Sequence, residues 1–144
     1  MTDATFAHVG FTCQDPLKVE RFYTRHFGFR RVRVVPLGDE QIVFTQAGAL
    51  MLEIFRATEE RPIPAPEKDG YPWPGVRHLA FQVESVDAKL QSMGDEARVM
   101  LGPMDFDDFI PGWRAAWIAD PEGNIIEISQ GYQDQVPAPP PLEA

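Results

Sequence analysis

A short apolar segment that carries one histidine occurs twice, seventy residues apart, as Phe6-Ala7-His8-Val9-Gly10-Phe11-Thr12 and Arg77-His78-Leu79-Ala80-Phe81-Gln82-Val83. Both segments are predicted to be β-strands, in which successive side chains point to opposite faces. Each histidine then shares its face with small or polar neighbours, while the other face is apolar and can pack on helices. This pattern is typical of a strand that lines a cavity.

The elements that follow each histidine segment occur in the same order, which predicts two βαβββ modules and an α+β fold. Each module is expected to have one helix, over 17–27 and 85–93, ending at a glycine. Three strands follow each helix. They are expected at 30–35, 41–45 and 49–55 in the first half, and at 97–101, 113–119 and 124–129 in the second.

Composition divides the chain into two modules and two proline-rich segments. We expect a first module at 1–57, a linker without regular structure at 58–76, a second module at 77–132 and a flexible tail at 133–144, together forming one structural domain. A length of 144 residues suits one such domain.

Charge, hydropathy and cysteine content indicate the cellular compartment and exclude some classes of partner. The net charge of −9 argues against a nucleic-acid or anionic-membrane surface. No apolar run approaches the ~18 residues of a membrane span, and the N-terminus lacks a signal pattern. The single Cys13 excludes an internal disulfide framework. The sequence therefore predicts a soluble cytoplasmic protein.

A glutamate between two aliphatic residues closes each module, at Leu52-Glu53-Ile54 and Ile126-Glu127-Ile128. Taken alone, each glutamate fits simple alternation in a sheet with one wet face. However, His8, Glu53, His78 and Glu127 are equivalent positions of a repeat. If the halves are related by pseudo-twofold symmetry, the two histidine strands become neighbours, as do the two glutamate strands. The four side chains would then converge, and imidazole with carboxylate suits Zn, Ni, Co, Fe or Mn.

With these residues in place, the chain resembles the vicinal oxygen chelate superfamily, which includes glyoxalases, antibiotic-binding proteins and extradiol dioxygenases. The resemblance covers about residues 5–130. It is supported by Arg21-Phe22-Tyr23 before Gly28-Phe29 and by Asp120-Pro121-Glu122-Gly123-Asn124 before Ile126-Glu127. The His/Glu/His/Glu set is most similar to bacterial glyoxalase I.

The resemblance implies a cupped mixed sheet around one divalent metal ion per site (Ni, Co, Zn, Mn or Fe), held by His8, Glu53, His78 and Glu127. It implies a lyase or isomerase that abstracts a proton next to a metal-bound carbonyl or hydroxyl. Glu127 is the favoured base by family analogy, with Glu53 as the other candidate catalytic carboxylate. Two alternatives stay open: an iron-dependent extradiol-type dioxygenase, and a non-catalytic small-molecule or antibiotic binder.

Two positions depart from the members that use glutathione. Those members usually carry Arg four residues after the first His and Asn four residues after the first Glu, where this chain has Thr12 and Ala57. The departures argue against glutathione as the substrate.

The cavity wall is expected from apolar side chains on the metal face, which implies a partly apolar substrate. The candidates are Phe6, Met51, Phe55, Trp117 or its face partner, and Ile125. The loop 106–113 is predicted either to close over this cavity or to be an ordinary surface loop.

The oligomeric state is predicted only from the general frequency of symmetric oligomers. A two-fold homodimer is the commonest oligomer. The modules can pair within one chain or between two, and the sequence leaves this choice open.

Overall fold

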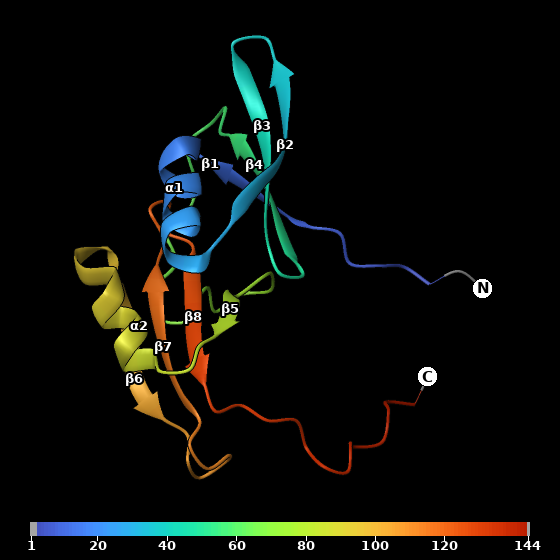
Figure 1. Cartoon of the computed structure of the whole chain (residues 1–144), viewed down its shortest axis with the longest axis vertical. Helices are drawn as coiled ribbons and strands as arrows, with labels where there is room; N and C mark the ends of the chain where they lie inside the picture. The colour runs from blue at the N-terminus through green and yellow to red at the C-terminus, as the bar shows by residue number, and fades with distance from the viewer. Residues whose placement is uncertain (1–2, 144) are drawn as a thin grey trace. The chain divides into compact units, whose positions relative to one another are not determined.

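The computed structural model describes residues 3–143 and contains two four-stranded mixed sheets, each with one α-helix (Figure 1). The strand orders are β1-β4-β3-β2 and β5-β8-β7-β6, so the second sheet repeats the first. The predicted α+β fold of two βαβββ modules is confirmed. The elements are β1 (Val9–Cys13), α1 (Pro16–Phe27), β2 (Arg30–Leu37), β3 (Glu40–Ala47), β4 (Leu50–Arg56), β5 (Leu79–Gln82), α2 (Val86–Met93), a short 3-10 turn (Gly94–Glu96), β6 (Arg98–Asp105), β7 (Arg114–Ala119) and β8 (Ile125–Gln130).

The ends of helix α1 are set by local chemistry. Asp15 precedes the helix, and its side chain accepts a hydrogen bond from the Lys18 amide at 3.1 Å. This bond satisfies one of the free N–H groups of the first turn, and Pro16 loses nothing there because it has no N–H. Gly28 ends the helix in the left-handed region at φ 71°, where a glycine has no steric penalty.

One face of the first sheet is buried against α1, and the other face carries Glu53. β1 runs parallel to β4, and β4 runs antiparallel to β3. Leu52 and Ile54 are buried, whereas Glu53 between them is half-buried. Because side chains alternate along a strand, Glu53 lies on the face opposite the core.

The second module is built in the same way. Ser85 caps α2 by accepting a hydrogen bond from the Ala88 amide, and α2 packs on β7 and β8. Ile126 and Ile128 are fully buried, and Glu127 between them is half-buried. The second glutamate therefore has the same relation to its core as the first.

The chain forms two compact units. Unit 1 comprises Met1–Ala65 and Asp120–Gly123, and unit 2 comprises Pro66–Ala119 and Asn124–Ala144. The predicted linker has no helix or strand, and its residues 58–65 belong to unit 1 while 66–76 belong to unit 2.

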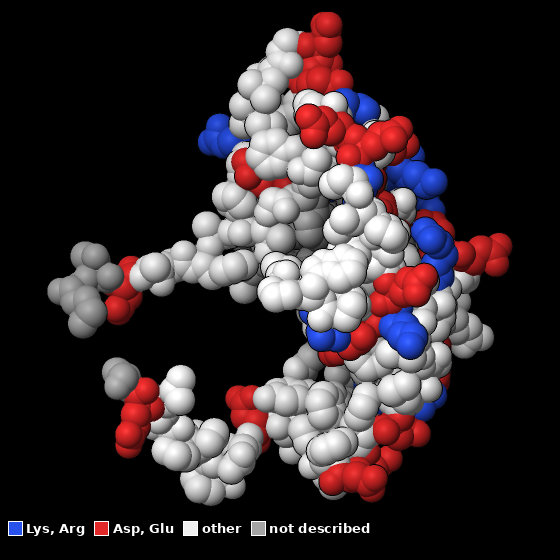
Figure 2. Space-filling view, turned by 180° about the vertical axis from the view of Figure 1, so that it is seen from behind, with Lys and Arg blue, Asp and Glu red and all other residues white. Residues whose placement is uncertain are grey.

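The surface is charged, and acidic and basic side chains intermingle over the face drawn in Figure 2 without a continuous basic field. Within residues 3–143, none of the helices has the length and apolar character needed to span a membrane.

One detail differs from the sequence expectation. The histidine strands begin at Val9 and Leu79, so His8 and His78 lie one residue before them. Each histidine strand pairs with the glutamate strand of its own module, β1 with β4 and β5 with β8. β1 and β5 are the edge strands of their four-stranded sheets. This pairing brings a histidine and a glutamate together within each module.

Candidate metal centre

In unit 1, the parallel pairing of β1 with β4 brings His8 to Glu53. Gly10 is the register partner of Glu53, and His8 lies two residues earlier on the same side. The His8 Nε2 atom lies 3.0 Å from Glu53 Oε1, with side-chain exposures of 36% and 18%. The pair therefore stands at the rim of the sheet, where a ligand can reach it.

In unit 2, the same register is repeated. Ala80 is the partner of Glu127 in the β5–β8 pair, and His78 lies two residues before Ala80. The His78 Nε2 atom lies 3.4 Å from Glu127 Oε1, and both side chains are largely buried, with exposures of 20% and 17%. The repeat therefore holds in side-chain geometry as well as in sequence.

Each histidine–glutamate pair has an aromatic neighbour that the repeat also places. Phe44 lies opposite Glu53 across β3 and β4, and Trp117 lies opposite Glu127 across β7 and β8. The Phe44 ring packs edge-on to His8 with centroids 5.7 Å apart. The Trp117 ring packs edge-on to His78 with centroids 6.3 Å apart. Each pair is therefore shielded on one side by an apolar surface.

In unit 2, a main-chain carbonyl holds the imidazole of His78 in place. The Nδ1 atom of His78 lies 2.6 Å from the carbonyl oxygen of Asp69. A carbonyl oxygen can only accept, so Nδ1 carries the proton, and in the neutral ring Nε2 has a free lone pair. That lone pair and the Glu127 carboxylate face each other as two acceptors. A cation held by both atoms removes this conflict, so the donor set fits a metal ion.

The spacing of the donor atoms also suits a common ion. Nitrogen and oxygen ligands at about 2.1 Å from a metal are separated by roughly 3.0 Å at a right angle and roughly 3.4 Å at a tetrahedral angle. The Nε2–Oε1 distances of 3.0 Å and 3.4 Å lie within the separation that two ligands of one ion can have, and the shorter one is also that of an ordinary N–H···O hydrogen bond. Each pair can therefore supply two ligands to an ion without moving apart.

Of the predicted metal residues, the structure brings together His8 with Glu53 and His78 with Glu127. Over residues 3–143, neither unit by itself gathers three or more His, Cys, Asp or Glu side chains in a metal-binding group. The convergence of all four on one ion stays a prediction.

The predicted cavity wall in unit 2 coincides with an apolar cluster on the metal face. Trp117 and Ile125 are buried in it with Ala115. Met104 and Phe106 pack against this cluster, and Phe106 lies 6.2 Å from Trp117, ring centre to ring centre. In unit 1, Met51 and Phe55 are half-buried on the strand that carries Glu53, whereas Phe6 is 69% exposed. The loop 106–113 closes on itself through a hydrogen bond from the Phe106 amide to the Trp113 carbonyl.

Sequence reasoning missed Phe44 and Asp69. Phe44 carried a signal, because it precedes Glu53 by nearly the same distance as Trp117 precedes Glu127. Asp69 carried none, since its contribution to His78 is a main-chain carbonyl, which every residue has.

A cavity of about 400 Å³ lies elsewhere in unit 1, and it is not the predicted site. Its lining includes Leu17 of α1, Val43 of β3 and the Glu40–Arg56 ion pair. Val43 pairs with the buried Ile54, on the helix-covered side of the sheet, so the cavity is on the opposite face from Glu53.

The fold and these pairs define a class: proteins of two βαβββ modules in which each module offers one histidine and one glutamate on the same face of its sheet. The chain belongs to the Glyoxalase/Bleomycin resistance protein/Dioxygenase superfamily, whose family profile matches residues 5–128. This is the vicinal oxygen chelate superfamily that the sequence resembles, so the predicted family is confirmed.

Three relatives illustrate the relationship. The uncharacterized protein YwkD of Bacillus subtilis (strain 168) is 26% identical over 125 residues, which cover 84% of this chain and 92% of YwkD. A glyoxalase family protein from Enterococcus faecalis is 27% identical with a TM-score of 0.64, covering 87% of this chain and 96% of that one. The fosfomycin resistance protein FosX from Listeria monocytogenes, solved with Mn(II) and sulfate, is 15% identical with a TM-score of 0.60, covering 91% and 95%. This last likeness shows the fold alone.

Membership of this superfamily supports a metal-dependent function on a small-molecule substrate, since its members bind divalent ions and are usually enzymes. It does not select the reaction, because one fold hosts many chemistries.

Proposed function

We propose that this protein is a divalent-metal-dependent, glyoxalase-like lyase or isomerase that removes a proton next to a carbonyl or hydroxyl group of a small, partly apolar substrate. The observation that carries the proposal is the repeated pairing of His8 with Glu53 and of His78 with Glu127, at 3.0 Å and 3.4 Å and in the same register. Chance alternation of polar residues does not reproduce both the register and the spacing in two modules.

The four side chains of these pairs would hold the ion: His8, Glu53, His78 and Glu127. A divalent ion bound there would supply Lewis acidity, stabilising negative charge on a substrate oxygen. The candidate ions are Ni, Co, Zn, Mn and Fe, since each accepts imidazole and carboxylate ligands.

The carboxylates supply the proton transfer. We assign Glu127 as the base and Glu53 as the carboxylate that stays a ligand, because two carboxylates in different surroundings can divide these roles. The surroundings differ here: Trp117 lies opposite Glu127, and Phe44 opposite Glu53. Both carboxylates are mostly withdrawn from water, so a nearby proton on a substrate meets little competition from solvent.

The apolar side chains beside the His78–Glu127 pair indicate the class of substrate. Trp117, Met104 and Phe106 form an apolar surface beside the His78–Glu127 pair. A small molecule with two neighbouring oxygens and an apolar remainder matches such a surface. Thr12 and Ala57 stand where glutathione-using members carry Arg and Asn, so we do not expect glutathione.

Metal content of the purified protein, measured by elemental mass spectrometry, tests the site. The wild type is expected to hold about one ion per site, and His78→Ala is expected to lose it. Glu84→Gln, an exposed carboxylate of the same unit, serves as the control and should keep the ion. No bound ion after reconstitution with all five metals would contradict the proposal and favour a non-catalytic binder. Bound iron with oxygen uptake would favour the dioxygenase.

Deuterium exchange into a set of small 2-hydroxy ketones tests the chemistry. Glu127→Gln should keep the metal and lose exchange by about 10²–10⁴-fold, the contribution typical of a positioned general base. Glu127→Gln with undiminished exchange would exclude this base, and Glu53→Gln would then be the variant to examine.

A further inference from the structure

We propose that the loop 66–77 fixes the tautomer and orientation of His78 before any metal ion binds, and that the main-chain carbonyl of Asp69 is the positioning group. The inference rests on the proposed role of His78 as a metal ligand. It goes beyond that role because it assigns a function to a loop that contributes no ligand.

The contact itself determines the tautomer. Asp69 offers a carbonyl oxygen 2.6 Å from His78 Nδ1, and this oxygen has no proton to give. The imidazole must therefore donate from Nδ1, which leaves Nε2 as the atom that faces Glu127. Only this tautomer can offer Nε2 as a ligand without first losing a proton.

The loop can reach His78 because residue 70 is a glycine. Gly70 has φ +127°, a conformation that side chains rarely adopt, and a Cβ there would collide with the main-chain carbonyl oxygen of Arg77. The backbone at position 70 therefore lies directly against the residue that precedes His78. A larger residue would push Asp69 and its carbonyl away from the imidazole.

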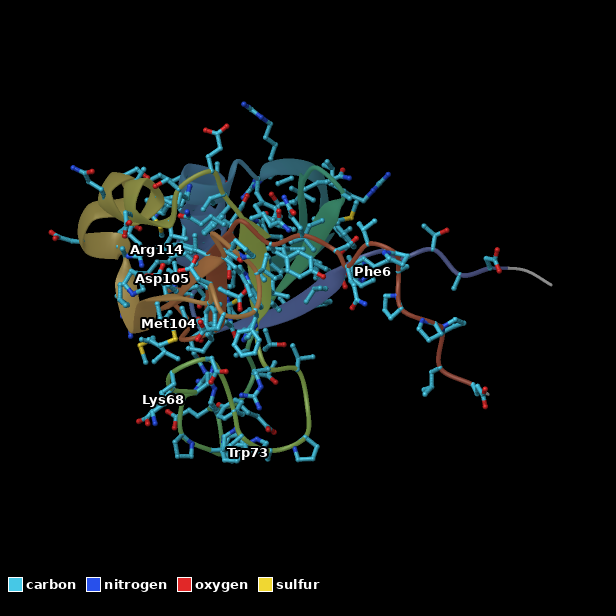
Figure 3. The ribbon with its side chains drawn as sticks, turned by 90° about the horizontal axis from the view of Figure 1, so that it is seen from below. Phe6, Lys68, Trp73, Met104, Asp105 and Arg114 are labelled. Carbon is cyan, nitrogen blue, oxygen red and sulfur yellow. The ribbon has the colours of Figure 1, made fainter. Side chains whose placement is uncertain are left out.

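Further contacts hold the loop in this position. The Asp69 carboxylate pairs with the Arg77 guanidinium at 3.1 Å, and the Gly70 amide donates to the Glu67 carbonyl at 3.0 Å. Tyr71 and Trp73 stack, with centroids 4.6 Å apart and planes inclined by 21°. Figure 3 shows Trp73 on this loop, which stands out from the sheet as a separate lobe.

Among the described residues that precede His8, 3–7, none forms a turn or bend. His8 is more exposed than His78, at 36% against 20%. His8 and His78 are equivalent residues of the repeat. The hydrogen bond to the Asp69 carbonyl orders His78 before an ion binds, whereas His8 is the more exposed of the two. Ordering a ligand before binding reduces the entropy lost when the ion arrives, so His78 is the better prepared of the two.

Nitrogen-15 NMR of histidine-labelled, metal-free protein tests the tautomer directly. We expect His78 to show a single form with the proton on Nδ1. A wild-type spectrum in which Nδ1 of His78 lacks the proton, or in which two tautomers exchange, would overturn the proposal whatever the variants do.

Zn²⁺ titration by calorimetry tests the consequence, with matched glycine variants. Gly70→Ala should lower Zn²⁺ affinity about 10–100-fold, the loss typical when the partner of a metal-binding histidine is removed. Gly94→Ala is the control: Gly94, at the end of α2 and outside the loop, also has a positive φ, of +58°, and a Cβ there meets nothing within 4 Å. Equal affinity in the two variants would contradict the positioning role.

Asp69→Ala covers the case in which Gly70→Ala fails to fold. It keeps the main-chain carbonyl but removes the ion pair with Arg77, so the affinity should fall several-fold and the Nδ1 proton should exchange faster. Unchanged affinity and exchange would count against the loop. If wild-type protein binds no Zn²⁺ or other ion while the Nδ1 tautomer is present, the proposed function fails and the loop's effect on His78 stands.

Discussion

Trp117 and Glu127 lie directly opposite each other on β7 and β8, as Phe44 and Glu53 do on β3 and β4. The indole ring is 7% exposed, and among the described residues its Nε1–H has no hydrogen-bond partner. Phe44 and Trp117 are therefore equivalent residues of the two modules. The Phe44 ring has no polar atom, whereas the Trp117 ring has an N–H donor without a partner in residues 3–143.

Trp117→Phe should therefore cost little stability. The smaller ring gives up some buried apolar surface, but it also removes an unpaired donor whose burial costs about 1–3 kcal/mol. Because the lost apolar contacts and the removed unpaired donor oppose each other, we expect the free energy of unfolding in urea to change by less than about 1.5 kcal/mol.

Trp117→Ala is the contrasting variant, and its cavity should cost about 3–5 kcal/mol. Similar losses in both variants would show that the Nε1–H is satisfied in solution.

Tyr23 should stabilise unit 1 through its hydroxyl group. The hydroxyl donates to Asp120 Oδ2 at 2.6 Å, both residues are fully buried, and Asp120 Oδ1 accepts from the Glu122 amide. Tyr23→Phe should lower the free energy of unfolding by about 1.5–3 kcal/mol, the range for a hydrogen bond to a charged group. Urea denaturation measures the change.

Tyr132→Phe is the matched control. Tyr132 is 44% exposed, so its substitution should change stability by less than about 0.5 kcal/mol. Equal effects of the two substitutions would contradict a special role for the buried pair.

Alkaline pH should destabilise the fold through Tyr23. Burial, and then the charge of Asp120, raise the pKa of Tyr23 well above its usual value of 10.0. The folded state therefore keeps the proton where the unfolded chain releases it. The stability that Tyr23 contributes in this way is fully present below about pH 10 and falls above it, at about 1.4 kcal/mol per pH unit. The difference between wild type and Tyr23→Phe isolates this contribution, and it should be constant below pH 9 and shrink above pH 10.

Cys13 should be unreactive in the folded protein. Its side chain is completely buried, and burial, followed by the charges of Glu122, Asp120 and Asp15, raises the pKa of the thiol from 9.0 to about 12. Since the thiolate is the nucleophile, alkylation by iodoacetamide at pH 8 should be about a thousandfold slower than in urea. Mass spectrometry of timed samples measures both rates. Comparable rates would mean that the first strand opens readily.

Much of the fold was predictable because its signals are local. Asp15, Pro16 and Gly28 mark the ends of α1 whatever surrounds them, and the structure places the helix at Pro16–Phe27, against the expected 17–27. Alternation around Glu53 and Glu127 identified the side of each strand that faces away from the core. Strand ends were less accurate: β6 extends to Asp105, four residues beyond the predicted 101.

Non-local contacts were the part that the sequence did not reveal. Asp120 reads as a turn residue before Pro121, yet it is fully buried and bonded to Tyr23, 97 positions away. The linker likewise reads as a passive connection, whereas Asp69 within it holds the imidazole of His78. Neither contact has a spacing or composition that marks it in advance.

The sequence by itself determined the family, the two-module order and the four candidate ligands. The reason is that helix caps, alternation along strands and repeated motifs can be recognised from short stretches of consecutive residues. Only the tertiary structure decided which residues meet: His8 with Glu53, His78 with Glu127, and the Asp69 carbonyl with His78. The physical reason is that parallel strand pairing and loop closure join segments far apart in the chain. The choice of partner then depends on register and on the space left by Gly70, not on the identity of neighbours in sequence.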